Sequence, residues 1–538
     1  MMHSARVTFS VITSVILLAC LSHPAQAQDA VPHSVESLDK QQPGHPPSEI
    51  GSQGKQGNSK QSSSSSAGVL GLLPADSVTE HVLNVGSQTL SYKATAGTLN
   101  LYGQDGNRSA AVFYTSYVAD HQGADRPLTF VFNGGPGAAS AFLHLGLVGP
   151  KVLDFGPLGR DGANARLVDN PESWLAFTDL VLIDPIGTGW SRTAKPDEAK
   201  EFYGVRQDAQ AIAKTIALYI AHSGRFSSPA YLFGESYGGL RAVKVAHVLQ
   251  QDQGIAVSGI VMLSPLLEGP ITLGANRFPF GAALQLPSLA AAEMERAKTF
   301  SKDGVEAAEQ FAMHDFLVTL AGPPPQGPAA DMFYQRVAKF TGLPIETVRR
   351  TRGFVRDEFI KHLRKDDDSI VSRYDAAFAA PDPFPESTAA KQDDPILDGF
   401  VRSYGGAFVR YARDQLGYKT EMTYILLAED INGKWDWGRG SRSQISVSDD
   451  LRQLLALNPS MRVLIAQGYS DLVIPYAANK YVVDHLPDNI DRRVTFKVYR
   501  GGHMLYTRPP SRTEFTTDAK AFYADHIRCC AEQDRSER

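Results

Sequence analysis

Cysteine is scarce in this chain, with 3 among 538 residues, which excludes a disulfide-dense scaffold. Cys20 lies near the N-terminus, whereas Cys529 and Cys530 are neighbours near the C-terminus. Two adjacent cysteines can barely close a ring with each other. The sequence therefore predicts no structural disulfide in the folded core.

An excess of positive charge is also lacking. The net charge of -5 at pH 7 leaves no basic surface of the kind that nucleic acids require, so we expect no nucleic-acid partner. The acidic run "KDDDS", Lys365–Ser369, lacks the spacing of a calcium loop and is interpreted as a solvated turn. We predict neither a metal ion nor another cofactor.

Long apolar runs are missing except near the N-terminus, and that run, Val7–Leu21, is short for a membrane span. Arg6 precedes it, and Ala25–Ala27 forms a small-residue cleavage pattern after it. We expect residues 1–27 to be a signal peptide, with export to the periplasm or the medium and no stable membrane insertion after cleavage. A buried N-terminal helix and a lipid anchor on Cys20 are the two alternatives.

The remaining chain divides by composition. Residues 28–68 are rich in Ser, Gln, Gly and Pro, which bury too little apolar surface to fold, so we expect a disordered linker. We find no internal repeat. We expect an α/β core over 69–269 and 458–527, a helical cap insertion over 270–457, and a C-terminal tail over 528–538.

The pattern of apolar residues predicts the fold class. Alternating stretches such as "RSAAVFYTSYVA" predict antiparallel strands first. Six shorter runs follow that are apolar on both faces, as in the central strands of a mostly parallel sheet: "PLTFVFNGGPG", "DLVLIDPIGTGWS", "PAYLFGES", "SGIVMLSPL", "MRVLIAQGYSD" and "RVTFKVYRGGH". Helical patterns lie between some of these runs, and such an order predicts an α/β fold. The mainly helical insertion is expected at the carboxyl ends of the strands, where α/β sheets bind ligands.

Ser236 lies where the apolar run "YLFGE" meets a helical pattern, inside Gly-Glu-Ser-Tyr-Gly, which is the layout of a nucleophile elbow. The motif alone is weak, because a tight structural turn gives the same letters. Asp471 and His503 each follow another predicted strand, in the hydrolase order of serine, acid and histidine. Asp184 also follows a strand, but it precedes the serine. We therefore predict a triad of Ser236, Asp471 and His503.

An acyl-transfer site also needs N–H donors for the oxyanion. The backbone N–H of Tyr237 stands at the positive end of the helix that follows Ser236. A second donor is expected from the loop "NGGPG", where Gly134 and Gly135 let the backbone approach a substrate. The alternative for this loop is an ordinary glycine turn.

Five segments together resemble the landmarks of the serine carboxypeptidase family, peptidase family S10, over about residues 85–527: "NGGPGAAS", "NPESW" with "DPIGTGWS", "GESYGG", "GYSDLVIP" and "GGHM". "SRYDAAFAAPDPF" and "GKWDWG" resemble its bacterial branch most. The resemblance implies an α/β-hydrolase fold with a helical cap. It also implies an acyl-enzyme on Ser236 during hydrolysis of C-terminal residues from peptides with a free C-terminus.

The resemblance further implies Gly135 and Tyr237 as the oxyanion hole, and Asn133 and Glu235 as the groups that hold the substrate's terminal carboxylate. An ionised Glu235 would repel that carboxylate, so Glu235 must be protonated, which favours binding at acidic pH. The alternatives are a turn-forming Asn133 and a helix-start carboxylate at Glu235.

The chain departs from the better-known members at three positions: Val131 replaces a Trp, Ala138 a Cys, and Leu147 a second Glu. Without that Glu no carboxyl pair shares a proton, which predicts a weaker preference for acid. The altered site favours a second hypothesis, a serine esterase or acyltransferase. A third is a noncatalytic binding protein, against which the complete triad argues. The sequence leaves open the oligomeric state and the preferred residues around the scissile bond.

Overall fold

The computed structural model describes residues 68–536, apart from 87, 121–125, 157–158, 274–277 and 389–392. The side chains of residue 365 and of 526–536 are also outside the description. The predicted signal peptide, and all but the last residue of the predicted linker, lie outside the described residues. Within the described part, no helix combines the length and the apolar character that crossing a membrane requires.

A ten-stranded sheet forms the centre of the structure, in the order β1-β2-β3-β7-β4-β9-β10-β13-β14, with β8 paired to β3. The strands are β1 Ser77–Val85, β2 Gln88–Tyr102, β3 Arg108–Ala119, β4 Leu128–Phe132, β7 Asp179–Ile183, β8 Arg192–Thr193, β9 Ala230–Glu235, β10 Gly259–Leu263, β13 Arg462–Gly468 and β14 Val494–Tyr499. Strands β1 to β3 pair antiparallel, and β7, β4, β9, β10, β13 and β14 pair parallel. The predicted mostly parallel sheet of an α/β-hydrolase fold is confirmed.

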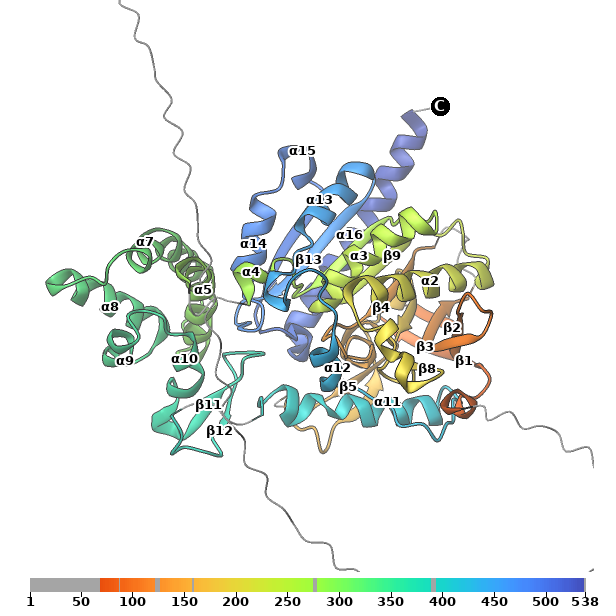
Figure 1. Ribbon diagram of the computed structural model, residues 1–538, viewed down its shortest axis with the longest axis horizontal. Coiled ribbons are helices and arrows are strands. Elements are labelled where there is room, and N and C mark those ends of the chain that lie inside the picture. The colour runs from red at the N-terminus through yellow and green to blue at the C-terminus, as the bar shows by residue number, and fades with distance from the viewer. Residues whose placement is uncertain are drawn as a thin grey trace, which may run out of the picture. The chain divides into compact units, whose positions relative to one another are not determined.

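The central parallel strands β4, β7, β9 and β10 are buried throughout because both faces of the sheet are covered. The edge strand β14 differs from the prediction, because its residues alternate between half-buried and exposed up to the buried Tyr499. In β9, Phe233 faces one core cluster and Leu232 faces the other, and Val131 and Phe130 alternate in the same way in β4. Residues of α2 (Val205–Ser223) and α3 (Tyr237–Asp252) belong to the second cluster, and residues of α16 (Pro509–Ser536) belong to the first (Figure 1). Successive side chains of a strand point to opposite faces of the sheet, so each of these two strands packs against a helical layer on both faces.

The helices of the described chain connect and cover these strands. They are α1 Ala141–Leu143, α2 Val205–Ser223, α3 Tyr237–Asp252, α4 Gly269–Thr272, α5 Pro279–Arg296, α6 Lys302–Phe311, α7 Leu317–Ala321, α8 Gly327–Thr341, α9 Ile345–Arg350, α10 Arg356–His362, α11 Ser403–Asp414, α12 Glu429–Lys434, α13 Ser448–Leu457, α14 Tyr476–Asp484, α15 Asp488–Asp491 and α16 Pro509–Ser536. Helix α16 includes most of the segment that the sequence suggested as a tail.

The insertion between β10 and β13 has two parts with different packing. Helices α5 to α10 surround a separate apolar cluster, shown in green in Figure 1. A hairpin of β11 Ser369–Val371 and β12 Ala379–Pro381 follows them, although the sequence pattern there indicated helices only. Helix α11 then returns to the main core, where Phe408 and Tyr411 are buried. Only the first part therefore has a core of its own.

Candidate active site

Ser236 occupies the corner between β9 and α3 with φ 61° and ψ -125°. A positive φ is rare for a residue with a side chain and has to be held by its surroundings. The Ser236 N–H donates to the Leu263 carbonyl at 2.9 Å, and the Ser236 carbonyl accepts from Gly239 at 3.0 Å and from Leu266 at 3.1 Å. These backbone bonds to the end of β10 and to the helix keep the strained corner in place.

Glycine is required on the strand side of this corner. A Cβ atom at Gly234 would lie 1.9 Å from the carbonyl oxygen of Gly238. No side chain fits at that distance, so the close turn excludes every other residue at Gly234. The Gly-x-Ser-x-Gly spacing is therefore a packing condition of the elbow.

His503 and Asp471 meet at the ends of two other parallel strands. The His503 Nδ1 lies 2.8 Å from the Asp471 Oδ2, and both side chains are buried. The Asp471 Oδ1 accepts hydrogen bonds from the N–H groups of Val473 at 2.8 Å and Ile474 at 2.9 Å. An ionised Asp471 held in this way fixes the proton on Nδ1 and leaves Nε2 to accept another.

Burial lowers the pKa of His503, but Asp471 and Glu235 favour its charged form, and the net result is a pKa above the usual range. The loop that carries His503 is tied to the elbow through Ser264. The Ser264 Oγ donates to the His503 carbonyl at 2.9 Å, and Ser264 directly follows Leu263, the partner of the Ser236 N–H. The structure therefore holds the loops of all three predicted triad residues together at one edge of the sheet.

The predicted oxyanion donors lie beside the elbow. A Cβ atom at Gly134 would lie 2.6 Å from the backbone nitrogens of Tyr237 and Gly238, so the glycine loop packs directly against the start of α3. Gly135 follows with φ 99°. As the first residue of α3, Tyr237 has no intrahelical acceptor for its N–H. Among the described residues, the N–H groups of Gly135 and Tyr237 donate to no backbone carbonyl outside regular elements, which leaves them for a ligand.

Asn133 and Glu235 form a buried pair beside the nucleophile. The Asn133 Nδ2 donates to the Glu235 Oε2 at 2.6 Å, and the Asn133 Oδ1 accepts from the Leu143 N–H at 3.1 Å. The Arg241 guanidinium donates to the Asn133 carbonyl and pairs with Asp208 at 2.6 Å. The hydrogen bonds to Glu235 and from Leu143 fix the orientation of the Asn133 side-chain amide, and its second Nδ2–H is left for a ligand.

Burial raises the pKa of Glu235 to about 7, against the opposing effects of His503 and of the hydrogen bonds from Tyr506 and Asn133. The charge of Asp471 acts in the same direction as burial. Glu235 is therefore neutral over a wide part of the acidic range. In that form it can donate a hydrogen bond to an anion.

Stretches of the chain are similar to known proteins. Residues 86–286 match the model of the serine carboxypeptidase family, Peptidase_S10. This part of the chain is therefore similar to the serine carboxypeptidase family. Serine carboxypeptidase-like 8 of Arabidopsis thaliana is 24% identical over 191 residues, which are 34% of this chain and 41% of that protein. Retinoid-inducible serine carboxypeptidase of Rattus norvegicus is 29% identical over 142 residues, 26% of this chain and 28% of that protein.

The chain therefore spans about two fifths or less of the length of these curated relatives. They come from a plant and a mammal, so the resemblance to the bacterial branch stays a prediction. Among solved structures, that of VinJ aligns with a TM-score of 0.36 at 17% identity, covering 79% of this chain and 98% of that one. The fold assignment rests on the strand order.

The residue in place of the serine carboxypeptidase family's second Glu is fully buried. Leu147 lies in the π-helical turn His144–Val148, and its carbonyl accepts from the Asn170 side chain at 2.7 Å. Its apolar side chain offers Glu235 no polar partner. Instead, the Tyr506 hydroxyl donates to the two carboxylate oxygens of Glu235, at 3.1 and 3.3 Å. Sequence reasoning missed Tyr506, because nothing in the pattern around it signals a partner 271 residues away.

A second feature that sequence reasoning missed is the segment 372–378, which is part of the motif that resembles the bacterial branch. Its backbone holds the loops of the acid and the base: the His503 N–H donates to the Tyr374 carbonyl at 2.6 Å, and the Ala376 N–H donates to the Ser470 carbonyl at 2.9 Å. The Ser470 Oγ donates to the Asp375 Oδ1 at 2.5 Å. The motif was visible in the sequence, but its role needed these contacts.

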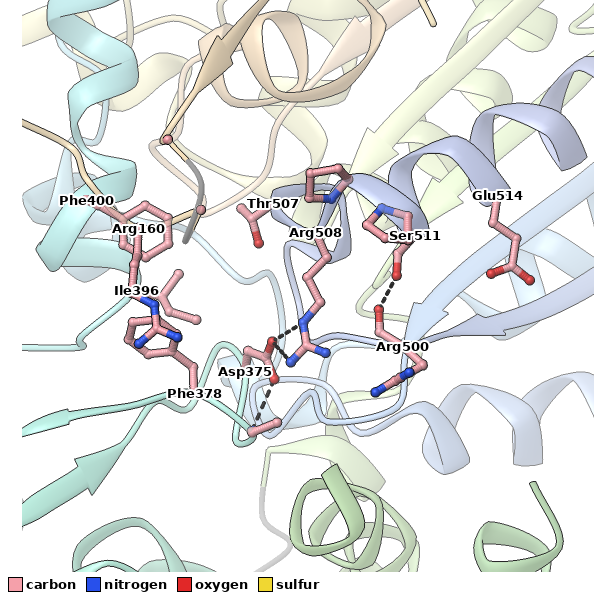
Figure 2. Close-up of a pocket in the computed structure, with 15 residues that line it drawn as sticks. Arg160, Asp375, Phe378, Ile396, Phe400, Arg500, Thr507, Arg508, Ser511 and Glu514 are labelled. Carbon is pink, nitrogen blue, oxygen red and sulfur yellow. Dashed lines mark hydrogen bonds and ion pairs between the residues drawn. The ribbon is translucent and has the colours of Figure 1, made fainter. Parts of the chain in front are cut away.

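Figure 2 shows Asp375 and Arg508 in contact with each other in the lining of a cavity of about 490 Å³. The Arg508 guanidinium donates to the Asp375 Oδ2 at 2.7 and 3.0 Å. Glu295 of α5 pairs with Arg500 at 2.5 Å and lies 3.8 Å from Arg508. The ion pairs fasten the insertion to the core next to His503. In the described part of the chain, no three His, Cys, Asp or Glu side chains gather as metal ligands.

Proposed function

We propose that the protein is an exported serine carboxypeptidase that releases C-terminal residues from peptides through an acyl-enzyme on Ser236. The observation that carries the proposal is the buried, hydrogen-bonded pair of Asn133 and Glu235, of which Glu235 directly precedes Ser236. A catalytic triad alone is compatible with many acyl-transfer reactions. A site beside it that binds a carboxylate would select substrates with a free C-terminus.

In the proposed reaction, the His503 Nε2 takes the proton of the Ser236 hydroxyl as the oxygen attacks the scissile carbonyl. Asp471 holds the imidazole and stabilises its charged form at 2.8 Å. The N–H groups of Gly135 and Tyr237 receive the oxyanion. His503 then protonates the leaving amine, and a water molecule activated by His503 hydrolyses the acyl-enzyme.

The leaving amino acid carries the carboxylate that Asn133 and Glu235 would bind. Asn133 supplies its second N–H, and neutral Glu235 supplies its O–H. An amidated C-terminus has no negative charge for these donors. We therefore expect efficient cleavage of free acids and poor cleavage of the matching amides.

A serine esterase or acyltransferase on the same site is the second candidate. Leu147 favours it, because this buried side chain removes one of the two acids that the family places around the carboxylate. The same triad would then accept an acyl group from an ester donor.

An assay on three substrates separates the two candidates. An N-blocked dipeptide, the same dipeptide amidated, and an aryl ester of the blocked residue are compared from acidic to neutral pH, with Ser236→Ala as the inactive control. Cleavage of the acid but little of the amide supports the carboxypeptidase. Ester turnover without release of an amino acid from the peptide would instead establish the esterase or acyltransferase.

Export is supported by the N-terminal pattern of Arg6, the apolar run and Ala25–Ala27. We expect the mature chain to begin at Gln28 and to be found in the periplasm or the medium. Cell fractionation with N-terminal sequencing tests this, and an intact Met1 on the cytoplasmic protein would refute it.

A further inference from the structure

The hydroxyl of Tyr506 is a buried partner of Glu235 that the proposed reaction does not use. Tyr506 follows His503 by three residues, in the 3₁₀ turn Leu505–Thr507. Its side chain is 1% exposed, and its hydroxyl lies 3.1 Å from the Glu235 Oε2 and 3.3 Å from the Oε1. A tyrosine donating to a carboxylate that itself adjoins the nucleophile can affect what that carboxylate binds.

We propose that Tyr506 is a positioning residue for carboxylate recognition: its hydroxyl takes the place of the missing second acid and orients Glu235 toward the substrate's C-terminus. This inference rests on the proposed carboxypeptidase function.

The ring of Tyr506 is held next to the position of the missing acid. A Cβ atom at Gly146 would lie 2.5 and 2.7 Å from two of its ring carbons, and 3.0 Å from the hydroxyl of Tyr404. Gly146 directly precedes Leu147 in the chain. The absence of a side chain at Gly146 therefore makes room for the Tyr506 ring beside the turn where the family carries its second Glu.

The two donors on Glu235 determine where its own proton lies. The Asn133 Nδ2 at 2.6 Å and the Tyr506 hydroxyl at 3.1 Å both point to Oε2, and Tyr506 is farther from Oε1. An oxygen that already accepts two hydrogen bonds is the poorer site for a proton. Neutral Glu235 is therefore protonated on Oε1, from which it can donate to a carboxylate.

Replacing a carboxyl by a phenol also changes how the site titrates. Burial raises the pKa of Tyr506 well above its usual value, so the hydroxyl keeps its proton throughout the working range. The other titratable groups that act on Glu235 or are acted on by it are His503, Asp471 and Tyr404. Because the second acid is missing, Glu235 shares no proton with another carboxyl group there. The pH dependence of binding of the terminal carboxylate then follows the ionisation of Glu235 alone.

The test compares Tyr506→Phe with the parent enzyme on the N-blocked dipeptide acid and on the aryl ester. We expect KM for the acid to rise about tenfold, the value of roughly one hydrogen bond, with kcat changed less than about twofold. We expect kcat/KM for the ester to change less than about twofold, because the ester presents no terminal carboxylate. The hydrogen bond from Tyr506 stabilises ionised Glu235, so its loss should raise the pKa of Glu235. The pH above which kcat/KM for the acid falls should therefore increase.

Tyr499→Phe is the matched control. Tyr499 is also buried, and its hydroxyl donates to the Asp518 carboxylate at 2.8 Å, away from the elbow. This variant loses the same kind of bond and should keep the kinetics of the parent enzyme on both substrates. A double variant with Glu235→Ala adds a further check, because the acceptor of the Tyr506 hydroxyl is then gone and loss of that hydroxyl should have little additional effect on KM.

Binding measurements keep the inference testable if Tyr506→Phe turns over poorly. Calorimetry on Ser236→Ala, with and without Tyr506→Phe, measures the affinity for the dipeptide acid and for its amide. A weaker affinity for the acid alone supports the proposal. Equal losses of affinity for the acid and the amide, or an unchanged KM and pH limit for the acid in the kinetic assay, would overturn it.

The two proposals fail in different ways. If the parent enzyme releases no amino acid from the dipeptide acid, the carboxypeptidase function is wrong, and this inference is wrong with it. If the parent enzyme cleaves the acid and Tyr506→Phe does so with the same KM and pH profile, only the role of Tyr506 is refuted.

Discussion

Replacing Glu235 with Gln tests the carboxylate site most directly. The amide of Gln is neutral at every pH and still has N–H groups that can donate to a carboxylate. Glu235 can do so only while it is protonated, and its pKa is raised to about 7 by burial. A raised pKa means that the neutral form is present below that value and is lost as the pH rises through it.

The expected magnitude follows from one ionisation. At pH 9, two units above that pKa, roughly one Glu235 in a hundred remains neutral, which corresponds to about 2.7 kcal/mol of lost binding. We therefore expect kcat/KM of the parent enzyme for the dipeptide acid to fall about tenfold per pH unit above neutrality. The Glu235→Gln variant should lack this fall, so its activity relative to the parent enzyme should increase steadily with pH.

The assay is a pH profile of kcat/KM from pH 4 to pH 9 for both proteins, with the aryl ester as the control substrate. Ionisation of Glu235 should leave the ester profile nearly unchanged, because the ester has no terminal carboxylate. A parent profile for the acid that stays flat to pH 9 would refute the reasoning. So would an alkaline fall of equal size on the ester, since the titrating group would then serve catalysis in general.

Three further predictions address other parts of the site. Asp471→Asn should lower kcat by about 10⁴ on acid and ester alike, because the imidazole loses the acceptor that fixes its tautomer, while KM for the acid is retained. Gly234→Ala should lower the melting temperature by several degrees or prevent folding, because its methyl group would lie 1.9 Å from the Gly238 oxygen; soluble protein with the parent melting curve would contradict the packing argument. Asp375→Asn should reduce kcat on both substrates about tenfold, through the weakened hold on the Asp471 loop, whereas the exposed Asp366→Asn should match the parent enzyme; equal activity of the two variants would refute that role.

Local patterns in the sequence were enough to predict the sheet and the corner that carries the nucleophile. Strands covered by helices on both faces are mainly apolar, so the central parallel strands were recognisable from local composition. The edge strand β14 was recognised as well, although one of its faces is exposed. The elbow was recognisable because a turn this close tolerates only glycine at Gly234. Strand order then implied that Ser236, Asp471 and His503 share one edge, since the carboxyl ends of parallel strands meet there.

The surroundings of these residues could not be predicted and became visible only in the folded chain. The donation from Tyr506 to Glu235 joins positions 271 residues apart, and the bond between Ser470 and Asp375 joins positions 95 apart. Neither contact follows from a periodic pattern. The first joins the turn after β14 to the end of β9, and the second depends on how the insertion between β10 and β13 turns back onto the core. The local sequence pattern indicates whether a residue is buried and in which element it lies. Which buried polar groups become partners depends on how distant segments pack.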